Sequence, residues 1–142
     1  MDKNEKFTVS KDMMLKLNKR DMYMQWLGIE FLELREDYIM TKLSVRDELL
    51  NNFGAIHGGV LYSLADITAG TLSCSHGRLT PTVDGHLNYM EPAIVKEYVT
   101  CEAKLKRYGA HLVSLNVEIK NEEGKLLDDG CFTFYRTESP IG

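Results

Sequence analysis

The chain has 142 residues, of which 44% are hydrophobic and 27% are charged, and its formal net charge at pH 7 is -4. This length suits one globular domain with its own core. The acidic balance gives no sign of the broad basic surface that attaches proteins to nucleic acids or anionic membranes, so neither is predicted as a partner. The three cysteines include no CxxC pair, which argues against a zinc ribbon or a thioredoxin-type site. The N-terminus lacks the apolar core of a secretory signal, so the predicted location is the cytoplasm.

The N-terminal third of the sequence predicts one helix followed by two strands. Ser10 is placed to cap a helix over residues 11–20, which would turn Met14 inward. Residues 27–34 are predicted to form the first strand. Residues 39–45 alternate apolar and polar side chains, which is the two-residue period of a half-buried strand.

The middle of the sequence predicts a long central helix that begins at Gly58 and Gly59 and ends near Gly77. Its apolar positions share one helical stripe: Val60, Leu61, Leu64, Thr68 and Leu72. Asp66 is the one acidic residue in the span 53–74. A lone carboxylate in an apolar helix is costly unless it is solvated or hydrogen-bonded, so Asp66 is a candidate functional group.

The C-terminal half predicts four further strands, over residues 82–90, 99–106, 113–120 and about 125–135. Short connections at residues 107–110 and 121–124 join neighbouring strands as hairpins, which makes the sheet antiparallel. The predicted fold class is therefore α+β. A curved antiparallel sheet would wrap around the single apolar helix, with an additional helix at the N-terminus.

Two segments carry a resemblance to a known family. Residues 51–66 read NNFGAIHGGVLYSLAD and residues 82–93 read TVDGHLNYMEPA. Together they resemble the PaaI-type branch of the hotdog acyl-CoA thioesterases, in the superfamily of 4-hydroxybenzoyl-CoA thioesterase, with its Asn, Gly, His-Gly-Gly and later Asp. The resemblance implies a hotdog domain over residues 25–138 after an N-terminal helical segment over residues 1–24. It also implies hydrolysis of a thioester.

The same resemblance implies roles for single residues. Asp66 matches the family's carboxylate, which acts as base or nucleophile. Gly58 matches the residue whose backbone N–H polarises the thioester carbonyl. Asn51 and His57 match residues that orient the substrate and its loop. Thr82 falls where relatives carry a hydroxyl that helps to hold the attacking water.

Further positions are candidates for substrate contacts. Gly59 would let the substrate approach the backbone closely, while Phe53 and Tyr62 are candidates to line an acyl pocket. Lys104 and Arg107 are candidates for contact with coenzyme A phosphates, although they fit a solvated surface as well. Coenzyme A would enter as part of the substrate, so no separate cofactor is predicted. The histidines show no metal-binding spacing, so no metal site is predicted either.

The spacing of the two central groups predicts an assembly. Asp66 follows Gly58 by eight residues on one helix, which separates them by about 12 Å at the helical rise. One carbonyl carbon cannot lie near both groups. The site would then pair Gly58 of one subunit with Asp66 of another, which predicts an obligate dimer or a dimer of dimers, that is, a homotetramer.

Two other functions stay open at this level. One is a non-catalytic hotdog module that binds acyl-CoA or regulates another process, and the other is a hydratase acting on enoyl thioesters. The choice between base and nucleophile for Asp66 also stays open, and so does the acyl group, for which aromatic or medium-chain acyls are candidates.

Overall fold

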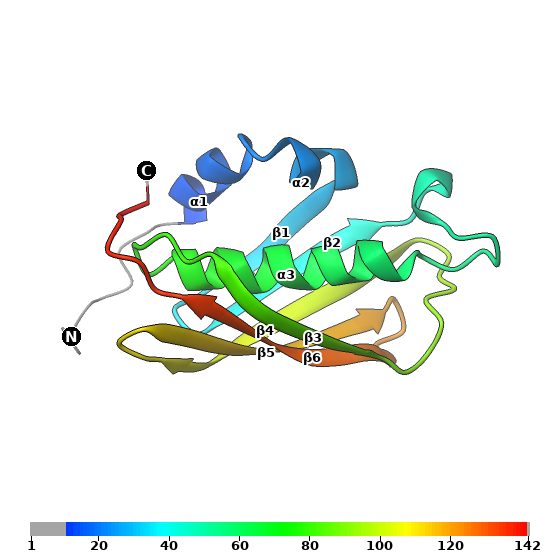
Figure 1. Cartoon of the computed structure of the whole chain (residues 1–142). Coiled ribbons are helices and arrows are strands. Elements are labelled where there is room, and N and C mark those ends of the chain that lie inside the picture. The colour runs from blue at the N-terminus through cyan, green and yellow to red at the C-terminus, as the bar shows by residue number, and fades with distance from the viewer. Residues whose placement is uncertain (1–10, 142) are drawn as a thin grey trace.

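The computed structural model describes residues 11–141, and its elements follow the order shown in Figure 1. The helices are α1 (Lys11–Asn18), α2 (Met22–Leu27) and α3 (Gly58–Cys74), with a short 3-10 turn at Asp47–Leu49. The strands are β1 (Ile29–Leu34), β2 (Tyr38–Ser44), β3 (Thr82–Tyr89), β4 (Tyr98–Tyr108), β5 (Leu112–Asn121) and β6 (Leu126–Tyr135). The predicted α+β architecture is confirmed.

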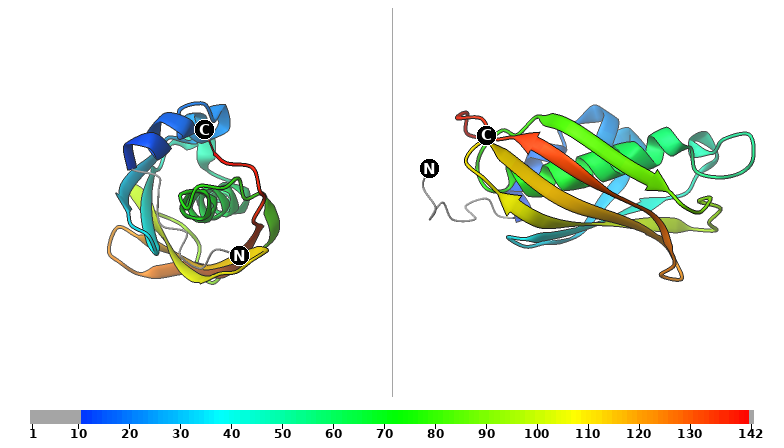
Figure 2. Two further views of the ribbon diagram at one scale, coloured as in Figure 1. Left: turned by 90° about the vertical axis from the view of Figure 1, so that its left-hand side faces the viewer. Right: turned by 60° about the horizontal axis from the view of Figure 1, so that its bottom comes forward.

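The strands form one curved antiparallel sheet in the order β1-β2-β4-β5-β6-β3. Viewed along α3, the sheet curls around the helix, and α1 and α2 lie over its open side (Figure 2). Strands that are neighbours in sequence pair through hairpins, except that β3 joins at the far edge beside β6. β1 and β3 are therefore the two edge strands of the sheet.

The apolar stripe of α3 forms the centre of the core. Leu61, Leu64, Thr68 and Leu72 are buried, whereas Val60 is only partly buried. The one polar member of the stripe is satisfied, because the Thr68 hydroxyl lies 2.7 Å from the hydroxyl of Thr41 on β2. The helix ends at Cys74, slightly before the predicted end. Truncating a fully buried leucine such as Leu64 to alanine would cost about 2–5 kcal/mol of folding free energy.

The N-terminal helical region differs from the prediction. The first helix stops at Asn18, and a second helix, α2, follows it. Asp21 caps α2 by accepting a hydrogen bond from Met24 N at 3.1 Å, and Gly28 ends it with φ of 77°. Leu27, predicted to open a strand, is the last residue of α2, so that prediction was wrong at its start. The cap and the terminating glycine are ordinary helix signals that the sequence already contained.

Other expectations for this region have mixed outcomes. Met14 faces inward as predicted, with 4% of its surface exposed. The proposed cap Ser10 lies outside the described residues. The expected division at residues 24 and 25 falls within α2 and stays a prediction. Among residues 11–141, no helix combines the length and apolar character needed to cross a membrane.

Candidate active site

The carboxylate of Asp66 has a specific partner. Thr82, the first residue of β3, donates a hydrogen bond from its hydroxyl to Asp66 Oδ1 at 2.8 Å. β3 runs back along α3, so its start lies beside the middle of the helix. The pairing fixes one carboxylate oxygen, and the second oxygen is left for other contacts.

These two residues line a pocket of about 240 Å³, which we call the Asp66 pocket. Met14 and Asn18 of α1 line the same pocket, and so does Asp21, the cap of α2. The side-chain nitrogen of Asn18 is buried and has no hydrogen-bond partner among the described residues. The N-terminal helices therefore complete a pocket around a residue of the central helix, which the sequence did not predict.

A second cluster surrounds the first turn of α3. His57 caps the helix, and its Nδ1 accepts a hydrogen bond from Gly59 N at 3.4 Å. Gly58 is the first helical residue, and no group in the described chain accepts a hydrogen bond from its N–H. Unpaired N–H groups and the helix dipole together make such an N-terminus a binding site for negative charge.

Tyr89 at the end of β3 holds this turn in place. Its hydroxyl donates to Gly58 O at 2.8 Å. Its ring also lies 3.4 Å from the point where a Cβ on residue 58 would stand, which is an ordinary van der Waals distance, so the ring packs closely over the first turn of α3. Burial raises the pKa of Tyr89, and the nearby Asp128 and Tyr62 raise it further, so the hydroxyl remains a donor at neutral pH.

The loop before α3 is organised by Asn51. Its side-chain oxygen accepts hydrogen bonds from Phe53 N at 2.8 Å and from Ala55 N at 3.1 Å. Phe53 is at the tip of this loop with 82% of its surface exposed. Asn51, Gly58 and Tyr89 line a pocket of about 290 Å³, which we call the Gly58 pocket.

The predicted residues thus separate into two groups within one protomer. Asn51, His57 and Gly58 gather at the start of α3, while Asp66 and Thr82 lie at its middle. The rise of the helix puts about 12 Å between the two groups.

Three other candidates lie outside these two groups. Tyr62 packs its ring against Phe132, with ring centroids 5.2 Å apart. Lys104 and Arg107 are exposed on β4, and Arg107 lines a different pocket at the β4–β5 connection. The structure therefore does not bring Lys104 or Arg107 to either pocket of its own protomer.

No group of three or more His, Cys, Asp or Glu side chains within residues 11–141 is arranged to hold a metal ion.

Comparisons with known proteins identify the family of the chain. The sequence profile described as "Thioesterase superfamily" matches residues 53–127, which contain all of α3 and all of β3. The chain belongs to the thioesterase superfamily.

Individual relatives resemble this thioesterase over most of its length. A protein of Archaeoglobus fulgidus named as a presumed esterase is 33% identical over 118 residues, covering 83% of this chain and 77% of that protein. The acyl-coenzyme A thioesterase PaaI of Escherichia coli is 27% identical over 100 residues, covering 70% of this chain and 71% of that protein. Human acyl-coenzyme A thioesterase 13 is 31% identical over 98 residues, covering 67% of this chain and 70% of that protein.

The solved structure of Escherichia coli PaaI has the same fold as this thioesterase. The TM-score is 0.82 with 22% identity, over 94% of this chain and 100% of that chain. The resemblance to PaaI-type hotdog thioesterases is therefore confirmed, both as a family and as a fold.

Proposed function

We propose that this thioesterase hydrolyses an acyl-CoA at sites shared by two protomers, with Asp66 of one protomer facing Gly58 of the other. The observation that carries the proposal is the separation of the two groups along a single helix. Each pocket holds half of the needed chemistry, so a complete site requires a second copy of the chain.

The Asp66 half supplies the attacking oxygen. As a base, Asp66 takes a proton from water while the water oxygen attacks the thioester carbonyl carbon. As a nucleophile, its own oxygen attacks and forms an anhydride, which water then hydrolyses. The hydroxyl of Thr82, 2.8 Å from Oδ1, orients the carboxylate for either route.

The Gly58 half stabilises the charge that attack creates. The carbonyl oxygen becomes an oxyanion, and the unpaired N–H of Gly58 is the donor proposed to bind it. A well-placed donor of this kind is typically worth about 10²–10³ in rate. Collapse of the intermediate breaks the carbon–sulfur bond and releases coenzyme A and the free acid.

The substrate class follows from the relatives. Both PaaI and the human relative are named acyl-coenzyme A thioesterases, which supports acyl-CoA as the substrate here. Coenzyme A is then part of the substrate, and no separate cofactor enters the proposed reaction. Contact of Lys104 or Arg107 with its phosphates stays a prediction, as does an aromatic or medium-chain acyl group.

The first test is thiol release from a panel of acyl-CoA substrates by the wild type and by Asp66→Asn. The variant should lose about 10²–10⁴ in rate, the usual contribution of a positioned acid or base. Tight acyl-CoA binding without thiol release would favour a regulatory binding module instead. Loss of enoyl absorbance without thiol release would favour a hydratase.

The second test asks whether the site is shared. Gly58→Pro removes the N–H at the first helical position, where proline is tolerated, and Gly58→Ala is its control because alanine keeps the N–H. Each of Asp66→Asn and Gly58→Pro should be inactive alone. Equal mixing with subunit exchange should restore about a quarter of wild-type activity, because half of the dimers would carry one intact site. No recovery in a verified mixed dimer would contradict the shared site.

A further inference from the structure

Asp128 on β6 is a buried carboxyl that the proposed reaction does not use. Its side chain is fully buried, with 0% of its surface exposed. Neither of its oxygens has a hydrogen-bond partner among the described residues. Such a group normally costs folding free energy, so its presence calls for an explanation.

Regular strand alternation turns Asp128 toward the helix, because it shares a face of β6 with the buried Phe132 and Phe134. Asp128 is opposite Ile119 on β5, but the next pair is Lys120 with Leu126, so the register shifts there. Leu127 and Asp128 are consecutive, and yet both are buried. The bulge therefore lies between Asp128 and Leu126 and adds Leu127 as a second consecutive buried residue, while Asp128 keeps the regular inner face.

On its other side Asp128 is opposite Tyr89, in register on β3. Directly opposed side chains of an antiparallel pair lie on the same face, with Cβ atoms about 4.5–5.5 Å apart. Tyr89 is the residue whose hydroxyl binds Gly58 O and whose ring covers the first turn of α3. Asp128 is therefore one contact away from the proposed oxyanion site.

Within residues 11–141, acidic groups on three strands act on this carboxyl. Tyr89 on β3 faces the carboxyl directly, and Tyr62 on α3 interacts electrostatically with Tyr89. Cys101 on β4 interacts electrostatically with Asp128. Asp129 is adjacent on β6. Burial, and after it the charge of Asp129, raises the pKa of Asp128 to about 7.

We propose that Asp128 is a positioning residue that controls the first turn of α3 through Tyr89. While the Asp128 carboxyl is uncharged, Tyr89 stays bonded to Gly58. When the carboxyl ionises, it takes the Tyr89 hydroxyl as its donor and the bond to Gly58 is lost. The inference rests on the proposed role of the Gly58 N–H.

The physical reason is the difference between the two forms of the acid. A neutral carboxylic acid tolerates an apolar site, whereas a buried carboxylate without a donor is strongly disfavoured. The hydroxyl of Tyr89 is the donor on the directly opposed residue. The Tyr89 hydroxyl now donates to the backbone carbonyl of Gly58. When the hydroxyl moves away, the loop and the first turn of α3, which orient the Gly58 N–H, lose this contact.

The experiment measures kcat/KM for thiol release from pH 6 to 9. The wild type should lose about tenfold or more toward pH 9, since small displacements of catalytic groups cost up to about a hundredfold. Asp128→Asn is neutral at every pH and should remove this alkaline loss. Asp129→Asn, the matched control beside it, should keep the alkaline loss of kcat/KM, with the midpoint of that loss moved to lower pH.

A second variant separates positioning from simple stability. Tyr89→Phe lacks the hydroxyl, so adding Asp128→Asn to it should no longer change the pH profile. If Asp128→Asn raises only the unfolding temperature and leaves the pH profile of kcat/KM unaltered, the positioning role is overturned.

A readout without turnover keeps this inference separate from the proposed function. The NMR shift of the Gly58 amide should move between pH 6 and 9 in the wild type and stay constant in Asp128→Asn. A shift that moves alike in both proteins overturns the inference. An inactive wild type with the expected shift behaviour would overturn the proposed function alone.

Discussion

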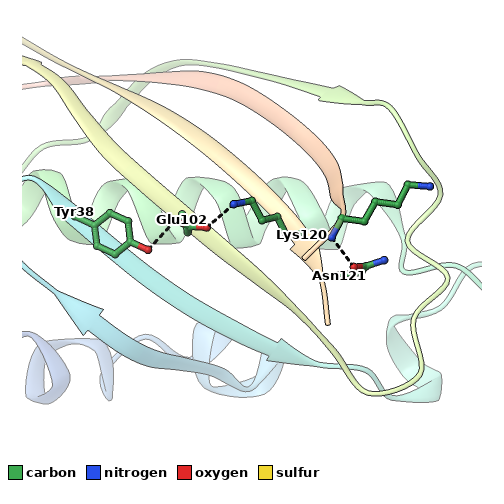
Figure 3. Close-up of polar contacts among 5 residues, drawn as sticks. Tyr38, Glu102, Lys120 and Asn121 are labelled. Carbon is green, nitrogen blue, oxygen red and sulfur yellow. Dashed lines mark hydrogen bonds and ion pairs between the residues drawn. The ribbon is translucent and has the colours of Figure 1, made fainter. Parts of the chain in front are cut away.

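Glu102 on β4 and Asp128 on β6 are both carboxyls of the same sheet, but they lie on opposite faces of it. Glu102 points to the outer face, where Tyr38 Oη donates to it at 2.7 Å and Lys120 Nζ binds it at 3.1 Å (Figure 3). Asp128 points to the inner face, where no described residue binds it. The outer acid is held by hydrogen-bond partners, and the inner acid has none in the described part of the chain.

The surroundings shift the pKa values of the two acids in opposite directions. Burial alone would raise the pKa of Glu102, but the hydrogen bonds from Tyr38 and Lys120 outweigh it and the pKa is lowered. Burial dominates for Asp128, so its pKa rises to about 7. Burial raises the pKa of both carboxyls, and only Glu102 has hydrogen-bond donors that outweigh it and stabilise its charged form.

The largest expected effect is on the inner acid. Replacing Asp128→Asn should raise the free energy of unfolding at pH 8 by about 2–4 kcal/mol and change it little near pH 4. The raised pKa means that the folded state binds the extra proton between about pH 4 and 7, so wild-type stability falls as pH rises through that range. Urea unfolding at both pH values measures it.

The neighbouring acid is the control for this comparison. Asp129 is half-buried and accepts a hydrogen bond from Asn88 Nδ2 at 3.0 Å. Asp129→Asn should therefore change the stability difference between pH 4 and pH 8 only slightly. If the free energy of unfolding depends on pH equally in the Asp128 and Asp129 variants, the Asp128 carboxylate must have a hydrogen-bond donor in the folded state.

A smaller effect of opposite sign is expected for the outer acid. Glu102→Gln should cost about 1–2 kcal/mol at pH 7, because it removes a carboxylate that accepts two hydrogen bonds. The wild-type advantage exists above the unfolded pKa near 4.5 and is lost as pH falls through the lower folded pKa. Thermal unfolding from pH 3 to 7 follows this loss.

Glu118 is the matched control, because it faces both Glu102 and Asp129 in register on β5. Glu118→Gln relieves like charges and should be neutral or slightly stabilising. If both glutamate variants lose the same stability, the hydrogen bonds to Glu102 contribute nothing specific.

The smallest effect is expected for the hydroxyl that binds Glu102. Tyr38→Phe should cost about 0.5–1 kcal/mol at pH 7, since one hydrogen bond is lost at a partly exposed site. Burial and the hydrogen bond to Glu102 raise the pKa of Tyr38. Spectroscopic titration should show one fewer tyrosine ionising late in the variant, and an unchanged titration would contradict the contact.

Much of the fold could be predicted because the sheet imposes a two-residue period. Residues 39–45 and 113–120 alternate in sequence, and the corresponding strands alternate in burial. The central helix was recognisable because its sequence contains almost no charge. The second short helix was missed, since six residues are too few to show a helical period.

The site was predictable only where its residues are close in sequence or carried by a family motif. The pairing of Asp66 with Thr82 confirms that they lie together, although their chemical roles stay predictions. Asn18 could not be identified, because the fold alone brings α1 over the Asp66 pocket. Asp128 was missed although it alternates with the buried Phe132 and Phe134, because the neighbouring bulge leaves Leu127 and Asp128 both buried and interrupts the two-residue pattern at that end of β6.

The free edge of β3 has a practical consequence. No described strand pairs with that side of β3, and Val83 on it has 56% of its surface exposed. The unpaired N–H and C=O groups of an edge strand can form hydrogen bonds with the backbone of another chain. If a second copy covers this edge, dilution would dissociate the subunits of the proposed shared site and also expose an aggregation-prone edge. Concentrated stocks should therefore keep their activity longer than dilute ones.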